Sequence, residues 1–166
     1  MHPDDLRRFR SLGVVANFEP LWAQPNEIMT ELTEPRLGTE RSRWQYPIGT
    51  LVRSGAHVSF GSDWPVSSHE PLEGLAVAVT RQRPGDPDGP VFLADERIRL
   101  DEALRAYTSG TAFQAGDEQA AGTLEVGRAA DLVLTEADVT RVPPRELGEV
   151  TVAATYLRGV PVHGPC

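Results

Sequence analysis

Two short apolar segments, at residues 14–18 and 57–61, alternate along this chain with stretches of helical spacing. The pattern predicts helices over residues 4–12, 48–54, 72–82 and 100–113. Glycines at positions 13 and 55 are typical of helix ends. Helices that alternate with short strands are typical of α/β architecture, in which the strands run parallel. The polar stretch at residues 21–44 is expected to be a long loop.

The character of the sequence changes after Gly116. Residues 123–139 contain short apolar runs interrupted by Gly127, and residues 150–164 alternate apolar and polar positions around Arg158 and Gly159. This pattern predicts antiparallel strands joined by a tight turn. We therefore expect two parts, an α/β part over residues 1–116 and a part made of antiparallel strands over residues 117–166.

Two parallel strands leave long edges of unpaired backbone groups and do not make a stable sheet on their own. The chain has 166 residues, enough for one domain or for a piece of a larger one. A fold with more strands, such as a (β/α)₈ barrel, carries its functional residues just after the strands. Asp63 follows the apolar segment 57–61 in the sequence GSDWP, and it is the first candidate for such a role.

Charge and composition exclude several classes of protein. The formal net charge is −8, which disfavours binding to nucleic acid or to anionic membranes. The single cysteine, Cys166, cannot form an intrachain disulfide. The chain has no apolar run as long as a membrane span, which takes about 20 residues. We expect a cytoplasmic protein.

Several motifs occur together in one order: PRLGTERSRWQYPIGTLVRSG, GSDWPVSSHEPLEGLAVAVTR, LDEALRAYTSGTA and GTLEVGRAADLVL. With them the chain resembles the C-terminal third of metal-dependent amidohydrolases, most closely amidohydrolase family 3, which includes N-substituted formamide deformylases. The resemblance implies the last strands and helices of a TIM barrel. It also implies antiparallel strands of a small β-sandwich within residues 123–163, with Asp131 as a structural turn residue.

The resemblance implies that Asp63 is a catalytic residue and a metal ligand at the end of the last barrel strand. In such enzymes the carboxylate binds or borders a zinc ion and moves a proton from the water to the departing nitrogen. Water is a poor nucleophile at neutral pH, so this chemistry needs both a metal and a base. The alternative is that Asp63 only caps the next helix or turn.

Five further residues are candidates for contact with a substrate. Trp64 and His69 follow Asp63 on the same side, although His69 equally fits a surface loop. Glu19 and Trp22 leave the preceding strand, and the family usually has glutamine where Glu19 stands. Arg41 either pairs with a substrate carboxylate, fixes its loop through Glu40, or is a solvated charge.

A zinc site needs about three or four protein ligands, and the family takes most of its histidines from earlier strands. Among the histidines here, His2 fits a helix start, His57 opens a strand at the opposite end, and His163 falls in the sandwich. Zinc is therefore expected only in a complete enzyme that hydrolyses an amide-like carbon–nitrogen bond in a small molecule. The chain alone is then an inactive C-terminal fragment. The alternative is a non-catalytic α/β binding or assembly module, and a homo-oligomer is compatible with either.

Overall fold

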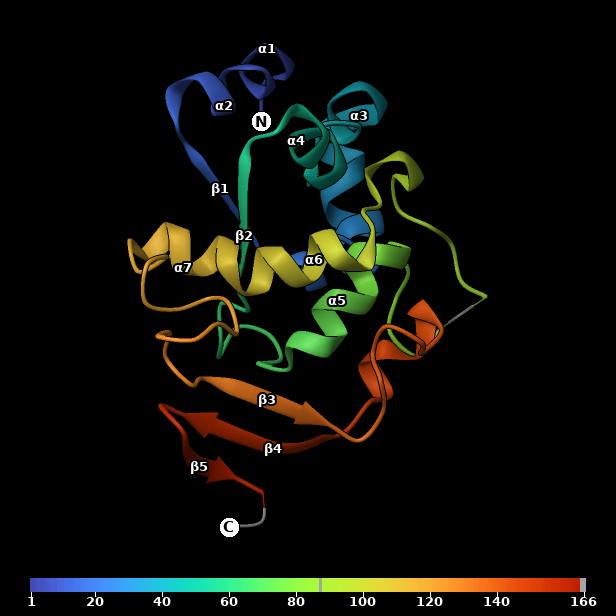
Figure 1. The fold of residues 1–166 in the computed structure, drawn as a ribbon. Coiled ribbons are helices and arrows are strands. Elements are labelled where there is room, and N and C mark those ends of the chain that lie inside the picture. Colours follow the sequence, from blue (N-terminus) through green and yellow to red (C-terminus); the bar gives the residue numbers. More distant parts are fainter. Residues whose placement is uncertain (87, 165–166) are drawn as a thin grey trace.

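Two parallel strands form the centre of the N-terminal part in the computed structural model, which describes residues 1–86 and 88–164. Strand β1 (Val15–Phe18) pairs with β2 (His57–Phe60), and Phe18 lies opposite Phe60. Gly61 donates its backbone N–H to the Phe18 carbonyl oxygen at 3.0 Å, which extends the pairing by one residue. The predicted parallel pair is confirmed, and its strands run side by side in Figure 1.

The helices that precede these strands end where the glycines predict. Gly13 and Gly55 both adopt the left-handed conformation, at the ends of α2 (Arg8–Leu12) and α4 (Ile48–Ser54). The single helix predicted over residues 4–12 is instead two short helices, because α1 (Pro3–Leu6) ends at Arg7. His2 precedes α1, and its Nδ1 accepts a hydrogen bond from the Asp4 N–H at 3.3 Å. The interpretation of His2 as a helix-start residue is confirmed.

The prediction of a loop over residues 21–44 is wrong. A 3₁₀ turn, η1 (Pro20–Trp22), is followed by a wide helical segment, η2 (Ile28–Thr33), and by α3 (Glu34–Ser42). Gly38 interrupts α3 with a non-helical backbone. The segment contains a proline, a glycine and many polar residues, and therefore lacks the apolar spacing that identifies a helix in the sequence.

The third predicted helix is α5 (Pro71–Thr80), and the fourth is divided into α6 (Leu100–Tyr107) and α7 (Ser109–Ala115). Thr108 separates the two with φ −113° and ψ −89°. Helix α7 then lies against β2, where the His57 ring stacks on Phe113 with centroids 3.9 Å apart. A short 3₁₀ turn, η3 (Ala94–Glu96), joins α5 to α6.

The C-terminal part is a three-stranded antiparallel sheet in the order β3 (Leu132–Thr135), β4 (Val152–Leu157), β5 (Val160–His163). The prediction of antiparallel strands around a tight turn is confirmed: Arg158 and Gly159 both have positive φ, 51° and 78°, as such two-residue turns require. Asp131 accepts a hydrogen bond from the Arg158 N–H at 2.6 Å, a structural role. Residues 123–131 form turns and contain no strand.

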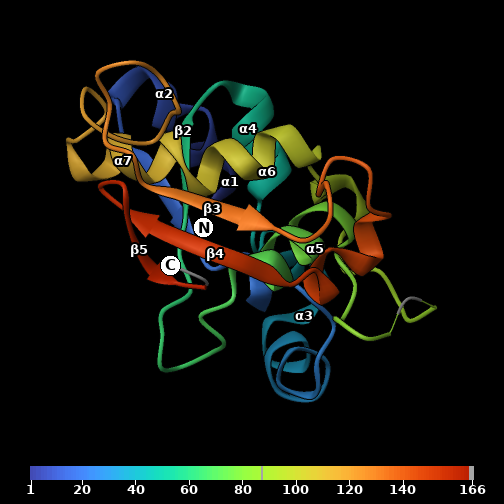
Figure 2. The ribbon, with the colours of Figure 1, turned by 60° about the horizontal axis from the view of Figure 1, so that its bottom comes forward.

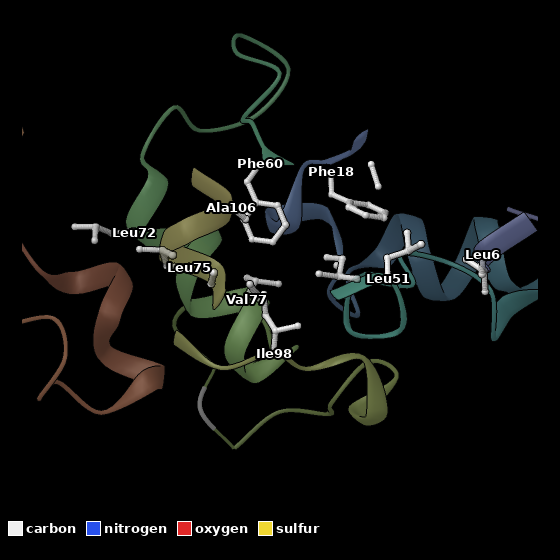
Figure 3. Packing of buried hydrophobic residues seen from close by; sticks show 14 residues of the cluster. Leu6, Phe18, Leu51, Phe60, Leu72, Leu75, Val77, Ile98 and Ala106 are labelled. Carbon is white, nitrogen blue, oxygen red and sulfur yellow. The ribbon is translucent and has the colours of Figure 1, made fainter. Parts of the chain in front are cut away.

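A single hydrophobic core connects the helices to both strands (Figure 3). Phe60 projects from β2 toward Ala106 of α6 and Val77 of α5, and Phe18 projects from β1 toward Leu51 of α4. The antiparallel sheet lies beside this unit (Figure 2), joined through the 3₁₀ segment η4 (Pro144–Glu149). Leu147 of η4 is fully buried, and η4 packs against α5. The two parts therefore share packed surface.

Candidate functional site

The candidate site lies where β1 and β2 end. Because Phe18 and Phe60 are paired, the next residues, Glu19 and Gly61, lie side by side on neighbouring strands. A methyl group placed on Gly61 would lie 4.0 Å from Glu19 Oε1. Asp63 comes two residues later. Parallel pairing thus brings two acidic residues, 44 positions apart in sequence, to one edge of the sheet.

Local hydrogen bonds hold the segment that carries Asp63. The Ser67 hydroxyl donates to the Ser62 carbonyl oxygen at 2.6 Å, and the Val66 N–H donates to the Asp63 carbonyl oxygen at 2.8 Å. Asp63 has φ 52°, an uncommon conformation for a residue other than glycine. Its exposed carboxylate makes no hydrogen bond or ion pair with the residues that the structure describes. Asp63 does not cap the next helix, because Glu70 precedes α5, but it begins the turn that the Val66 N–H closes, so the turn half of the alternative stays open.

Glu19 is partly buried between polar and aromatic neighbours. Its Oε1 accepts a hydrogen bond from Asn17 Nδ2 at 3.0 Å, and Asn17 Oδ1 in turn accepts one from the Ser59 hydroxyl at 3.0 Å. Burial, together with the negative charge of Glu19, raises the pKa of both Tyr46 and Tyr107. Glu19 thus sets a negative potential at the end of β1.

A hollow of about 720 Å³ lies beside the end of β1, where Phe18 lines it, and neither Glu19 nor Asp63 is among its lining residues. Phe18, Trp44, Tyr46, Glu40 and Arg41 are among the residues that line it. Two nitrogens of Arg41 are already engaged, since Nε donates to the Leu37 carbonyl oxygen at 2.7 Å and Nη2 to the Arg36 carbonyl oxygen at 3.0 Å. The guanidinium therefore holds the kinked part of α3, and one side of it remains for another partner.

The other candidate residues lie farther from the hollow. Trp22 ends η1 and is partly exposed, and its backbone N–H donates to the Glu19 carbonyl oxygen at 3.0 Å. Trp64 is 67% exposed, and its peptide bond to Pro65 is cis. His69 is exposed, with Nε2 3.3 Å from Glu70 Oε1. The structure thus brings Glu19, Trp22 and Gly61 together, and leaves Trp64 and His69 on the surface.

The sequence analysis missed Tyr46 and Arg81. Tyr46 lines the hollow and has φ 43°, whereas the proline that follows it favours an extended backbone, so no sequence signal identifies this conformation. Arg81 is completely buried, with Nε donating to the Phe92 carbonyl oxygen at 2.9 Å and Nη1 to that of Tyr46 at 3.3 Å. An arginine at a helix end normally reads as an exposed charge.

A metal site requires several His, Cys, Asp or Glu side chains close together. Within residues 1–86 and 88–164, no group of three or more His, Cys, Asp or Glu side chains is arranged to hold a metal ion. No helix in the same residues is both long and apolar enough to cross a membrane. Asp63 offers oxygen atoms, which suit divalent metal ions such as zinc.

Similarity to known proteins shows the fold and the family of this chain. The chain is similar to the crystal structure of a metal-dependent hydrolase from Pyrococcus furiosus, with a TM-score of 0.62 and 28% identity over 78% of this chain and 25% of that one. The architecture is therefore a mixed α/β one with amidohydrolase neighbours. The model of the amidohydrolase family matches residues 1–163, and the chain belongs to that family, in its family 3 branch.

Two curated relatives support the same assignment. The N-substituted formamide deformylase of Arthrobacter pascens is 34% identical over 116 residues, which are 69% of this chain and 21% of that protein. The putative amidohydrolase YtcJ of Bacillus subtilis is 29% identical over 128 residues, which are 77% of this chain and 24% of that protein. The chain therefore spans about a fifth to a quarter of the length of the curated relatives it matches.

Proposed function

We propose that this chain supplies the last carboxylate of a metal-dependent amidohydrolase, a hydrolase that cleaves an amide-like carbon–nitrogen bond in a small molecule. The observation that carries the proposal is the position of Asp63. It follows β2 at the edge where the two parallel strands end, on a segment fixed by its own hydrogen bonds. Carboxylates at the carboxyl ends of parallel strands are typical catalytic groups in α/β enzymes.

The family gives this position its chemistry. A zinc ion, when bound, lowers the pKa of a water molecule toward about 7. Asp63 would contribute one oxygen ligand and accept a proton from the attacking water. It would then pass the proton to the nitrogen that leaves. An exposed carboxylate that makes no ion pair with the described residues remains available for both tasks.

At the level of the fold, we assign residues 1–116 to the last strands and helices of a TIM barrel, and residues 117–166 to strands of a small β-sandwich. Support comes from the parallel pair of β1 and β2, the surrounding helices, and the antiparallel sheet that follows. The remaining zinc ligands would come from barrel strands outside these residues. We therefore expect the chain alone to bind zinc no more tightly than a few micromolar and to show no turnover.

A hybrid enzyme tests the proposal. In it, the matching segment of the Arthrobacter pascens deformylase is replaced by that of this chain, and hydrolysis of an N-substituted formamide is measured with zinc content and melting temperature. Asp63→Asn should lower the turnover number by about 10² to 10⁴, the effect of removing a general base. The melting temperature should change little, because the exposed side chain keeps its size.

Asp131→Asn is the matched control, since it makes the same substitution at a residue with a structural hydrogen bond. It should leave the turnover number unchanged. Near-normal turnover of Asp63→Asn with full zinc content would remove Asp63 from the mechanism. Tight stoichiometric zinc binding by the isolated chain would contradict the assignment of the other ligands. A hybrid enzyme that is folded and holds its zinc but shows no turnover would favour the non-catalytic module.

A further inference from the structure

Glu19 has an environment that a purely structural carboxylate does not explain. The residue directly follows β1, and its Oε1 faces the position of Gly61 on the neighbouring strand. The one hydrogen bond to its carboxylate within the described residues comes from the neutral amide of Asn17. No positively charged side chain in those residues forms an ion pair with it. A partly buried carboxylate without a cation is costly unless something else supplies the charge.

Two arginines near this edge donate hydrogen bonds to backbone groups. Arg81 is completely buried and donates to the backbone carbonyl oxygens of Phe92 and Tyr46. Arg41 donates from two nitrogens to carbonyl oxygens of its own helix. Both guanidinium groups therefore neutralise the dipoles of backbone groups. The charge of Glu19 is left for a group that comes from outside the chain.

The neighbours of Glu19 make the edge selective for positive charge. Tyr46 and Tyr107 are near enough to Glu19 that its charge, together with burial, raises the pKa of both phenols. A neutral phenol adds no negative charge, and its ring presents a face that attracts cations. Tyr46 also lines the hollow of about 720 Å³, as does Phe18, the residue before Glu19.

We infer that Glu19 is a specificity-determining residue that binds a positively charged group, a primary ammonium or a guanidinium, on the substrate. This inference rests on the proposed function, because it places the charge next to the bond that Asp63 would help to cleave. The substrate class is then an amide or formamide of a molecule with a second, cationic nitrogen. A charge-assisted hydrogen bond to the carboxylate supplies the discrimination against neutral analogues.

The experiment measures binding to the isolated chain, so it needs neither a metal nor hydrolysis. Isotope-labelled protein is titrated at constant ionic strength with n-butylammonium chloride, n-pentanol or sodium pentanoate, and the backbone amide signals of Glu19 and Gly61 are followed. We expect saturable shifts with butylammonium alone. Glu19→Gln, which keeps the size of the side chain, should raise the Kd by about three- to tenfold. Glu19→Asp retains the charge and should retain binding.

Glu40→Gln is the matched control, because Glu40 is an exposed carboxylate that lines the same hollow. It removes the same charge from the chain and should change the Kd by less than about twofold. The inference is overturned if wild-type chain shows no saturable shifts, or if pentanol binds as well as butylammonium. It is also overturned if Glu19→Gln and Glu40→Gln weaken binding equally. Failure of the hybrid enzyme to hydrolyse formamides would refute the proposed function and leave this binding result unaffected.

Discussion

Arg81 is the most deeply buried charged side chain described in the structure. None of its surface is exposed, and burial lowers the pKa of its guanidinium to about 10. This pKa is still well above 7, and the side chain is therefore protonated at neutral pH. The guanidinium donates to the Phe92 and Tyr46 carbonyl oxygens and lies over the Phe92 ring, whose centroid is 5.2 Å from the guanidinium carbon, while its Nη2 has no hydrogen-bond partner in the described residues. Arg81 therefore connects α5 to the segment that presents Tyr46 at the hollow.

Arg81→Lys tests this role at the level of one side chain. A lysine keeps the charge but cannot reach two carbonyl groups in the fixed geometry of a guanidinium. We expect a loss of about 1–3 kcal/mol in the free energy of unfolding, from hydrogen bonds to a charged group. Arg83→Lys is the control, since the ion pair of Arg83 with Glu27 is exposed and should contribute less than about 1 kcal/mol. Urea denaturation of the wild type and the two variants measures both losses of stability. An Arg81→Lys protein as stable as the wild type would refute the structural role of Arg81.

Sequence reasoning could reach some residues of the candidate site and not others. Glu19 directly follows β1 and Asp63 comes three residues after β2, so a pattern of two strands places both at one edge. Tyr46 and Arg81 come from segments that look like a loop and an exposed helix end. Their positions depend on how α5 packs against the segment before α4, which is a tertiary contact without a local signal.

At the scale of elements, α7 covers the edge of β2 that faces away from β1. The Thr111 hydroxyl donates to the Phe60 carbonyl oxygen at 3.2 Å, and Gly110 packs directly on the carbonyl oxygen of Val58. An exposed strand edge is a template for pairing with another chain. Here a helix closes it, and the close approach requires a residue without a side chain.

Gly110→Ala should separate α7 from β2. A methyl group at this position would lie 2.3 Å from the Val58 carbonyl oxygen, a backbone atom that cannot rotate away. We expect destabilisation by about 1–3 kcal/mol, as for other overpacked sites. Gly127→Ala is a useful comparison, because a methyl group there meets no atom within 4 Å and adds backbone strain alone. A thermal melt of each variant decides, and a Gly110→Ala protein as stable as the wild type would contradict the contact.

The helices and strands differ in how far the sequence specifies them. Short strands and the helices α4 and α5 have apolar spacing and clear end signals, and they lie where the pattern predicts. The breaks at Arg7 and Thr108, and the helical turns of residues 28–42, have no such signal. They follow from packing on neighbouring elements, which outweighs weak local propensity.

At the scale of the whole molecule, the antiparallel sheet has one partly covered face, where Leu134 is still 49% exposed, and one open face. Ala154 is buried toward the core, whereas Val133, Leu157 and Val160 share the opposite face by their register and are 54–61% exposed. Contiguous exposed apolar surface commonly marks a site of association. The net charge of −8 opposes nonspecific aggregation but does not cover these side chains.

We therefore expect the isolated chain to bind a hydrophobic dye and to self-associate as its concentration rises. Val160→Lys together with Leu157→Lys should reduce both effects, because two charges interrupt the apolar face. Dye fluorescence and light scattering after size exclusion give the two measurements. A concentration-independent monomer that binds no dye would refute the prediction.

The packing of η4 on α5 makes the two halves of the chain depend on each other. A protease that cuts in the exposed turns of residues 124–127 should produce two pieces that still migrate together, because Leu147 stays buried against the first piece. Leu147→Ala should weaken the association of the two pieces by about 2–5 kcal/mol, the loss of stability typical of a leucine removed from a core. The nicked pieces should then separate on a size-exclusion column. The packing of η4 on α5 thus holds the sheet on the α/β part, and a single cut in the backbone does not separate them.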